Sequence, residues 1–107
     1  MKTREEWLEE LPTGWRIAFG NQLADDVVAL AKKYNFENEY EVLQIKEKYG
    51  SLCWYEGHVP PEMHVEHSNL IQKYEEMSYR TCVICGAAAE APRGMYDQPI
   101  CDECRDN

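Results

Sequence analysis

Basic residues are scarce in this sequence. Its 107 residues include eleven Lys and Arg against twenty Asp and Glu, which gives a formal net charge of −9. A protein that wraps a nucleic-acid backbone needs a basic face, because it must neutralise phosphates. The composition therefore argues against nucleic acid as the partner. It predicts a solvated acidic surface, part of which can face a basic partner.

Long apolar runs are absent as well. The opening segment MKTREEWLEELP has no apolar run of the kind found in signal peptides. No stretch approaches the ~18 apolar residues of a membrane span. We therefore expect a cytoplasmic protein with no membrane segment. In that reducing compartment, paired cysteines serve as metal ligands or redox groups more often than as disulfides.

Motifs that mark a catalytic site are also missing. The sequence has no Gly-rich phosphate loop and no evident Ser/His/Asp set, and its glutamate pairs at 5–6, 9–10 and 75–76 fall on predicted solvent faces. The segments HVE at 64–66 and PICDEC at 99–104 faintly resemble the zinc-deaminase signature. However, Ile100 interrupts that signature, and the first cysteine pair would have no role in it. We therefore expect a protein that is not an enzyme.

Cysteine is concentrated near the C-terminal end. Four of the five cysteines lie in RTCVICGAAAEAPRGMYDQPICDEC, with the spacing C-x2-C-x15-C-x2-C. Each Cys-x-x-Cys turn places two sulfurs on one side of a small loop, and this spacing falls in the range of zinc sites. Gly86 directly follows the first pair and relieves a tight turn. The candidate ligands are Cys82, Cys85, Cys101 and Cys104.

The four cysteines predict a structural zinc ion. All four tetrahedral positions are filled by protein, so none remains for water or substrate. A redox site would need one Cys-x-x-Cys pair at the start of a long helix in a βαβ context, which neither pair has. A disulfide framework would need an oxidising compartment. We expect one Zn²⁺ that stabilises a segment with few large apolar residues of its own.

The first forty residues carry two helical patterns. Thr3 and Glu6 form a capping-box pattern, which predicts a short helix through Leu11. The segment Pro12-Thr13-Gly14 then interrupts it. Helical spacing resumes with an apolar face that predicts a helix over residues 15–34. That face consists of Trp15, Phe19, Leu23, Val27, Leu30, Ala31 and Tyr34.

The middle of the chain changes to a period of two. Residues 42–49 alternate, with Leu43, Ile45, Glu47 and Tyr49 on one face, and LCWYE follows the Gly50-Ser51 turn. This pattern predicts a two-stranded hairpin, which must pack on helices to be stable. A third helix is predicted over residues 63–78, with Pro61 in its first turn. Its apolar stripe consists of Met63, His67, Leu70, Ile71, Tyr74 and Met77.

Several single residues remain open. Cys53 lies within the second strand, and we interpret it as a small packed residue. His58, His64 and His67 lie near the start of the third helix, where surface or capping roles are expected. A second metal site built from His64 and His67 is the alternative. We expect the three tryptophans, at 7, 15 and 54, to be core or half-buried residues.

The order of these segments resembles a known group of proteins. GWRIAFGNQL, YEVLQIKEKYGSLCWY, YEEMSYRTCVICG and CDEC are similar in order to segments of uncharacterised small zinc-binding proteins from bacteriophages and prophages. The resemblance covers residues 14–104, and its most specific part is the IKEKYGSL hairpin, followed by a helix and RTCVICG. Members often have a final Cys-x-x-His pair and an Arg in the second strand, where this chain has Cys104 and Cys53. The resemblance implies the same four cysteine ligands and a viral or mobile-element origin.

The sequence thus predicts an α+β fold in which helices pack on a β-hairpin and a four-cysteine zinc knuckle or ribbon follows. Residues 1–80 form the helix–hairpin–helix core. Residues 81–107 form the knuckle, packed as part of the same single domain. We expect an acidic, non-enzymatic interaction protein that binds a host or phage protein and inhibits a host defence protein. The alternative is a small nucleic-acid-associated regulator with a basic strip of Lys46, Lys48, Lys73 and Arg80.

Overall fold

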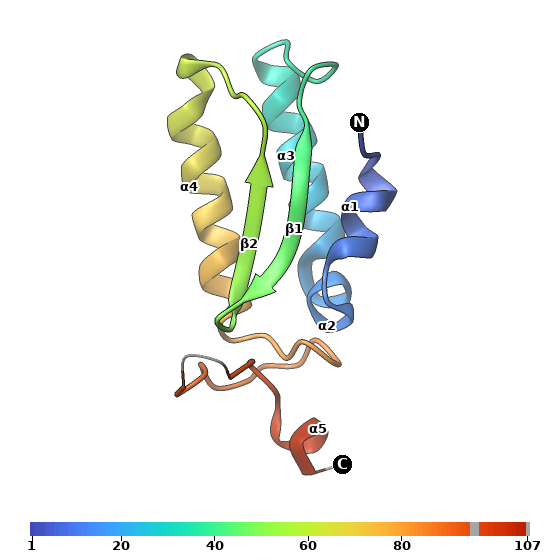
Figure 1. Cartoon of the computed structure of the whole chain (residues 1–107), viewed down its shortest axis with the longest axis vertical. Coiled ribbons are helices and arrows are strands. Elements are labelled where there is room, and N and C mark those ends of the chain that lie inside the picture. Colours follow the sequence, from blue (N-terminus) through green and yellow to red (C-terminus); the bar gives the residue numbers. More distant parts are fainter. Residues whose placement is uncertain (95–96, 107) are drawn as a thin grey trace.

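The computed structural model describes residues 1–94 and 97–106 and confirms the α+β fold class. Helices pack on a two-stranded antiparallel hairpin, and the four C-terminal cysteines cluster at one end. Figure 1 shows α3 and α4 behind and beside the hairpin, α1 next to β1, and the knuckle beyond the hairpin turn. The elements are α1 (Arg4–Glu10), α2 (Thr13–Trp15), the π-helix η1 (Arg16–Gly20), α3 (Asn21–Lys33), β1 (Val42–Lys48), β2 (Ser51–Glu56), α4 (Pro61–Ser78) and α5 (Asp102–Asp106).

The N-terminal break is shorter than expected. The capping box is confirmed, since the Thr3 side chain accepts from the Glu6 backbone and the Glu6 carboxylate accepts in return. The next helix begins at Thr13 rather than at Trp15, because Pro12 sits at the N-cap, where its missing N–H is tolerated. The chain then continues through η1 into α3.

The core lies between the hairpin and the helices. The predicted helical face of α2, η1 and α3 is buried there, and all three tryptophans belong to the core, as expected. In α4, Ser78 is buried while Met77 is 37% exposed, so the apolar stripe ends one turn earlier than predicted. The largest fully buried side chains are Trp15, Tyr74, Leu23, Leu52, Met63, Val27 and Val42.

A β-bulge changes the alternation of β1. The predicted strict period placed Leu43 on the face of Ile45, and this is wrong. Ile45 pairs with Trp54, whereas the register shifts between Val42 and Gln44, which leaves Leu43 as the extra residue. Val42 and Ile45 are therefore both buried, and Leu43 is 54% exposed. A bulge inserts one residue into the pairing and so reverses the face of everything beyond it.

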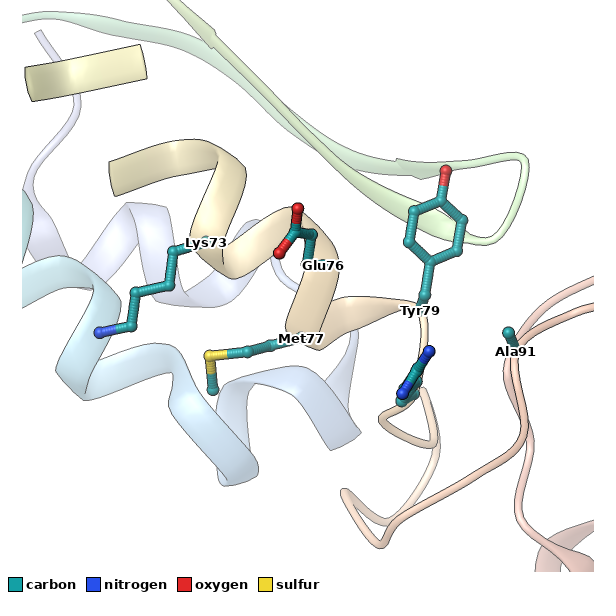
Figure 2. A pocket seen from close by; sticks show the side chains of 6 residues that line it. Lys73, Glu76, Met77, Tyr79 and Ala91 are labelled. Atoms are coloured by element: carbon teal, nitrogen blue, oxygen red, sulfur yellow. The ribbon is translucent and has the colours of Figure 1, made fainter. Parts of the chain in front are cut away.

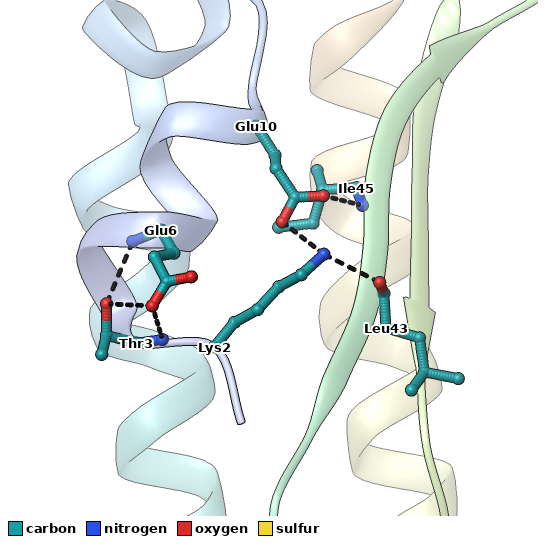
Figure 3. A network of polar contacts seen from close by, with 6 residues as sticks. All are labelled: Lys2, Thr3, Glu6, Glu10, Leu43 and Ile45. Atoms are coloured by element: carbon teal, nitrogen blue, oxygen red, sulfur yellow. Dashed lines mark hydrogen bonds and ion pairs between the residues drawn. The ribbon is translucent and has the colours of Figure 1, made fainter.

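Both edges of the hairpin are covered by side chains. The Glu10 carboxylate of α1 accepts from the backbone N–H of Ile45 at 3.1 Å, and Lys2 Nζ donates to the carbonyl of Leu43 at 2.8 Å (Figure 3). Lys2 and Glu10 also pair at 2.7 Å. Near α4, the Ser78 hydroxyl accepts from the N–H of Leu52 at 2.9 Å. These contacts occupy edge groups that would otherwise recruit another strand.

His67 is a core residue, so its expected surface or capping role is wrong. Its side chain is 3% exposed, and its Nε2 lies 2.6 Å from the Tyr40 hydroxyl. Trp54 Nε1 donates to that same hydroxyl oxygen at 2.9 Å, which leaves the Tyr40 O–H able to donate a hydrogen bond to His67 Nε2. Burial lowers the pKa of His67, although the nearby Glu56 carboxylate opposes this shift.

The helices within residues 1–94 and 97–106 include none long and apolar enough to cross a membrane.

Candidate metal centre

The first cysteine pair lies in a tight turn that leaves α4. Residues 79–80 lead into a short antiparallel bridge between Thr81 and Ala88. Within this loop, the Cys82 N–H donates to Ala87 at 2.8 Å and the Gly86 N–H donates to the Cys82 carbonyl at 3.0 Å. Gly86 has a φ of 85°, a left-handed conformation that costs glycine least. The turn-relieving role predicted for this glycine is therefore confirmed.

The second cysteine pair is brought alongside by the returning chain. The Val83 N–H donates to the Pro99 carbonyl at 3.0 Å, which places Cys101 beside the first turn. Cys101 directly precedes α5, and Cys104 lies within that short helix. The Arg105 N–H donates to the Cys101 carbonyl at 2.9 Å and closes its first turn. A spacing of three residues puts both sulfurs on one side of a helical turn. This helix was not predicted from the sequence.

The four sulfurs converge on one point. Cys82, Cys85, Cys101 and Cys104 place their Sγ atoms all within 4.8 Å of one another, and the Cys85 and Cys101 sulfurs are 3.5 Å apart. A tetrahedral ion with Zn–S bonds of about 2.3 Å would separate its sulfurs by about 3.8 Å. The cluster therefore fits a metal ion such as zinc. Cys82 and Cys101 are buried, whereas Cys85 is exposed, so the cluster lies at the surface.

Backbone hydrogen bonds favour the thiolate of Cys82. Burial opposes its ionisation, but bonds from the backbones of Cys101, Cys85 and Ile84 outweigh burial and lower its pKa to about 6. Hydrogen bonds to the Cys101 and Cys85 sulfurs raise the pKa of Cys104 to about 12. Metal binding displaces thiol protons, so a ligand that ionises readily lowers the cost of binding a cation here.

The knuckle is seated on the start of the long helical segment. The Gly14 N–H donates to the Val83 carbonyl at 2.7 Å, and Trp15 Nε1 donates to the Thr81 carbonyl at 2.8 Å. A Cβ added to Gly14 would lie 1.9 Å from the Cys82 carbonyl oxygen, which no side chain can do. The sequence marked Gly14 only as part of a helix break, so this contact was missed.

The loop between the cysteine pairs also rests on the hairpin turn. Gly50, with a φ of 86°, approaches so closely that an added Cβ would lie 2.6 Å from Pro92 Cγ and 2.9 Å from the Asp97 carbonyl. Gln98 Nε2 donates to the Glu47 carboxylate at 2.5 Å, and the other oxygen of that carboxylate accepts from the Gly50 N–H at 2.8 Å. The ligand loop is therefore held at the hairpin turn as well as at α2.

The remaining candidate residues lie outside this cluster. Cys53 is half-buried in β2 opposite Lys46, on the outward side of the hairpin, so it is less packed than expected. His58 and His64 are exposed. Among residues 1–94 and 97–106, the four cysteines form the one group of three or more potential ligands placed to share a metal ion, so a second site from His64 and His67 has no further ligand to complete it.

No protein-family profile, curated protein or solved structure matches this chain. The resemblance to phage and prophage proteins therefore stays a prediction, and the functional argument depends on the geometry of the chain itself.

Proposed function

We propose that this protein is a zinc-stabilised, non-enzymatic interaction protein that binds a protein partner in the cytoplasm. The observation that carries the proposal is the closed set of four thiols, whose sulfurs all lie within 4.8 Å of one another. Such a set fills every position of a tetrahedral ion and leaves none for water or substrate. The ion then contributes folding free energy rather than chemistry.

Zinc is the metal that this ligand set favours. Four thiolates in a tetrahedral arrangement bind zinc or iron–sulfur units, and hard cations such as Mg²⁺ prefer oxygen ligands. Purified protein should hold one zinc per chain, with four sulfurs at about 2.3 Å in X-ray absorption. Protein that contains no metal, with its four C-terminal cysteines joined as disulfides, would overturn the zinc assignment.

The partner we propose is a host protein with a basic groove, bound and inhibited by a phage-derived acidic surface. The net charge of −9 supports this view, because a strongly acidic protein is steered toward basic surfaces. Glu37, Glu39 and Glu41 are all exposed in the loop between α3 and β1, at the end away from the knuckle (Figure 1). A partner bound to this loop need not contact the metal cluster, because the loop and the knuckle lie at opposite ends of the fold (Figure 1).

Affinity capture tests this proposal. Tagged wild type, nuclease-treated, should capture a basic protein from bacterial lysate, and the triple substitution Glu37→Gln, Glu39→Gln and Glu41→Gln should weaken the capture. Glu5→Gln, Glu9→Gln and Glu103→Gln together form the control, since these carboxylates are also exposed, lie outside the loop, and give an equal change in charge. Capture of nothing by wild type, or equal effects of the two triple variants, would contradict the proposal.

The alternative function is a nucleic-acid-associated regulator, and one observation favours it. Lys46 and Lys48 share the outward face of the hairpin, and Lys46 Nζ lies 5.7 Å from the ring centroid of Tyr55. Exposed tyrosines beside cations are typical of surfaces that bind single strands. Tight binding of a dT12 oligonucleotide at physiological salt, lost in Lys46→Glu/Lys48→Glu, would promote this alternative.

A further inference from the structure

A groove of about 710 Å³ lies where α4 meets the knuckle. It is lined by Lys73, Glu76, Met77, Tyr79, Arg80 and Ala91. Figure 2 shows Met77 and Lys73 on one side of the last turns of α4, Tyr79 directed toward the hairpin turn, and Ala91 on the facing knuckle loop. Two separate parts of the chain therefore form this groove, the end of α4 with the two residues that follow it and the knuckle loop.

The apolar lining of the groove is open to solvent. Met77 is 37% exposed and Tyr79 is 41% exposed, although both side chains are large. Exposed aromatic and methionine side chains that gather in one hollow are typical of recognition surfaces. Methionine adapts its shape to different partners, and tyrosine presents a rigid contact area. The floor of the groove is therefore suited to an apolar side chain of a bound peptide.

The charge of the groove is opposite to that of the protein. Lys73 and Arg80 line it together with a single carboxylate, Glu76, in a chain whose net charge is −9. Neither cation forms an ion pair with any residue in 1–94 or 97–106. A guanidinium has a planar fork of donors that matches a carboxylate. An acidic group placed here would therefore meet two cations that have no other anionic partner.

We propose that this groove is the docking site for a short acidic segment of the partner protein, in which a carboxylate lies next to a large apolar side chain. This inference rests on the proposed protein-interaction function and assigns one of the contacts with the partner to this groove. A peptide fits better than nucleic acid, because a phosphate backbone needs many cations along its path, whereas this groove offers two, beside the Glu76 carboxylate, in a chain of net charge −9. One or two carboxylates avoid that repulsion.

The groove depends on the folded knuckle. Ala91 belongs to the loop between the two cysteine pairs, and its neighbour Pro92 rests on the Gly50 turn. The other wall belongs to α4 and its end, which the hairpin and α3 support. Metal binding by the cysteines therefore places one wall of the groove against the other, and peptide binding should require the metal.

Selection from a displayed library of random 12-residue peptides tests the proposal on zinc-loaded wild type. Selected sequences should carry Asp or Glu within a few residues of Leu, Met, Phe or Trp. The consensus peptide, fluorescein-labelled, is then titrated by anisotropy against wild type, Arg80→Glu and Lys73→Glu. Each substitution should weaken binding about tenfold or more, as expected for loss of a charge-assisted contact and gain of a repulsive one. Chelator treatment should abolish binding.

Lys32→Glu is the matched control, because Lys32 is exposed on α3 and the charge change is identical. Its affinity should stay within about twofold of wild type, since a distant surface charge is screened by salt. Zinc content and circular dichroism should be unchanged in all three variants. A basic consensus, no enrichment, or equal losses in Arg80→Glu and Lys32→Glu would overturn the proposal, as would dT12 binding more tightly than the peptide.

The two proposals fail in different ways. Wild type that captures no protein from lysate contradicts the proposed function. The peptide selection tests only whether the groove binds an acidic peptide, and its result does not depend on the lysate experiment. Undiminished capture of the partner by Arg80→Glu, together with loss of capture in the loop-glutamate variant, would overturn the groove and leave the proposed function standing.

Discussion

Replacing Gly14 by alanine tests whether the knuckle is seated on the helical core. Gly14 has no left-handed backbone angle, so alanine there meets no conformational strain. The added methyl group would lie 1.9 Å from the Cys82 carbonyl oxygen, 2.6 Å from the Val83 carbonyl carbon and 2.7 Å from the Gly86 nitrogen. Relief of the first contact alone requires the knuckle to move by more than about 1 Å, because interiors are close-packed.

The sign of the effect depends on which contribution is larger. Helix propensity alone would make Gly14→Ala stabilising by about 1 kcal/mol. Overpacking costs about 1–3 kcal/mol. The displacement also stretches the Gly14 bond to Val83 and the Trp15 bond to Thr81, each a net contribution of about 1 kcal/mol. We therefore expect a net destabilisation of about 2–4 kcal/mol.

Urea unfolding followed by tryptophan fluorescence, at a constant free zinc concentration, measures this change. Gly57→Ala is the control, because the nearest atom to its added methyl group would be 3.7 Å away, an ordinary contact. That variant should unfold within about 0.5 kcal/mol of wild type. Gly14→Ala should also bind zinc more weakly in competition with a chromophoric chelator. A Gly14→Ala protein as stable as wild type, or more stable, would refute the seating of the knuckle on this helix.

Three further predictions concern the metal, the buried histidine and the packing of α3 on α4. Cys101→Ser should keep most of the helical circular dichroism, while limited proteolysis should show that the knuckle has become protease-sensitive. A knuckle that stays resistant in this variant and in chelator-treated wild type would contradict a structural role for the metal. His67 has a pKa below its ordinary value of 6.5, so the unfolded chain takes up this proton first. The contribution of the neutral His67 to the free energy of unfolding should therefore be complete above about pH 6.5 and decline below it. His67→Gln should show a smaller decline. Urea midpoints that stay equal from about pH 8 to 5.5 in both proteins would exclude this role. Tyr74 donates to the Asp26 carboxylate at 2.6 Å, so Tyr74→Phe should cost about 1–3 kcal/mol in urea unfolding, whereas the outward-facing Tyr55→Phe should change stability little.

Local patterns in the sequence were sufficient for the main helices and the hairpin, though not for α5, and for the choice of the metal ligands. The helical spacing from Trp15 to Ala31 predicted the buried face correctly, because a period near 3.6 records which side of a helix avoids water. The two Cys-x-x-Cys turns predicted the cluster for a similar reason. Each turn brings its own two sulfurs together within four residues, so the geometry within each pair is local, whereas the meeting of the two pairs depends on the returning chain.

Tertiary structure decided the features that join distant segments. The exposure of Leu43 follows from a bulge in its pairing with β2, and the burial of His67 follows from Tyr40 and Trp54, which lie far from it in the chain. The contact between Gly14 and Cys82 spans most of the sequence. Periodicity reports how exposed a single position is, whereas a close approach between two positions depends on how whole elements pack. For that reason the sequence by itself determined the main helices, the hairpin strands and the four cysteine ligands, and only the folded chain determined what the cluster rests on and which groove it helps to form.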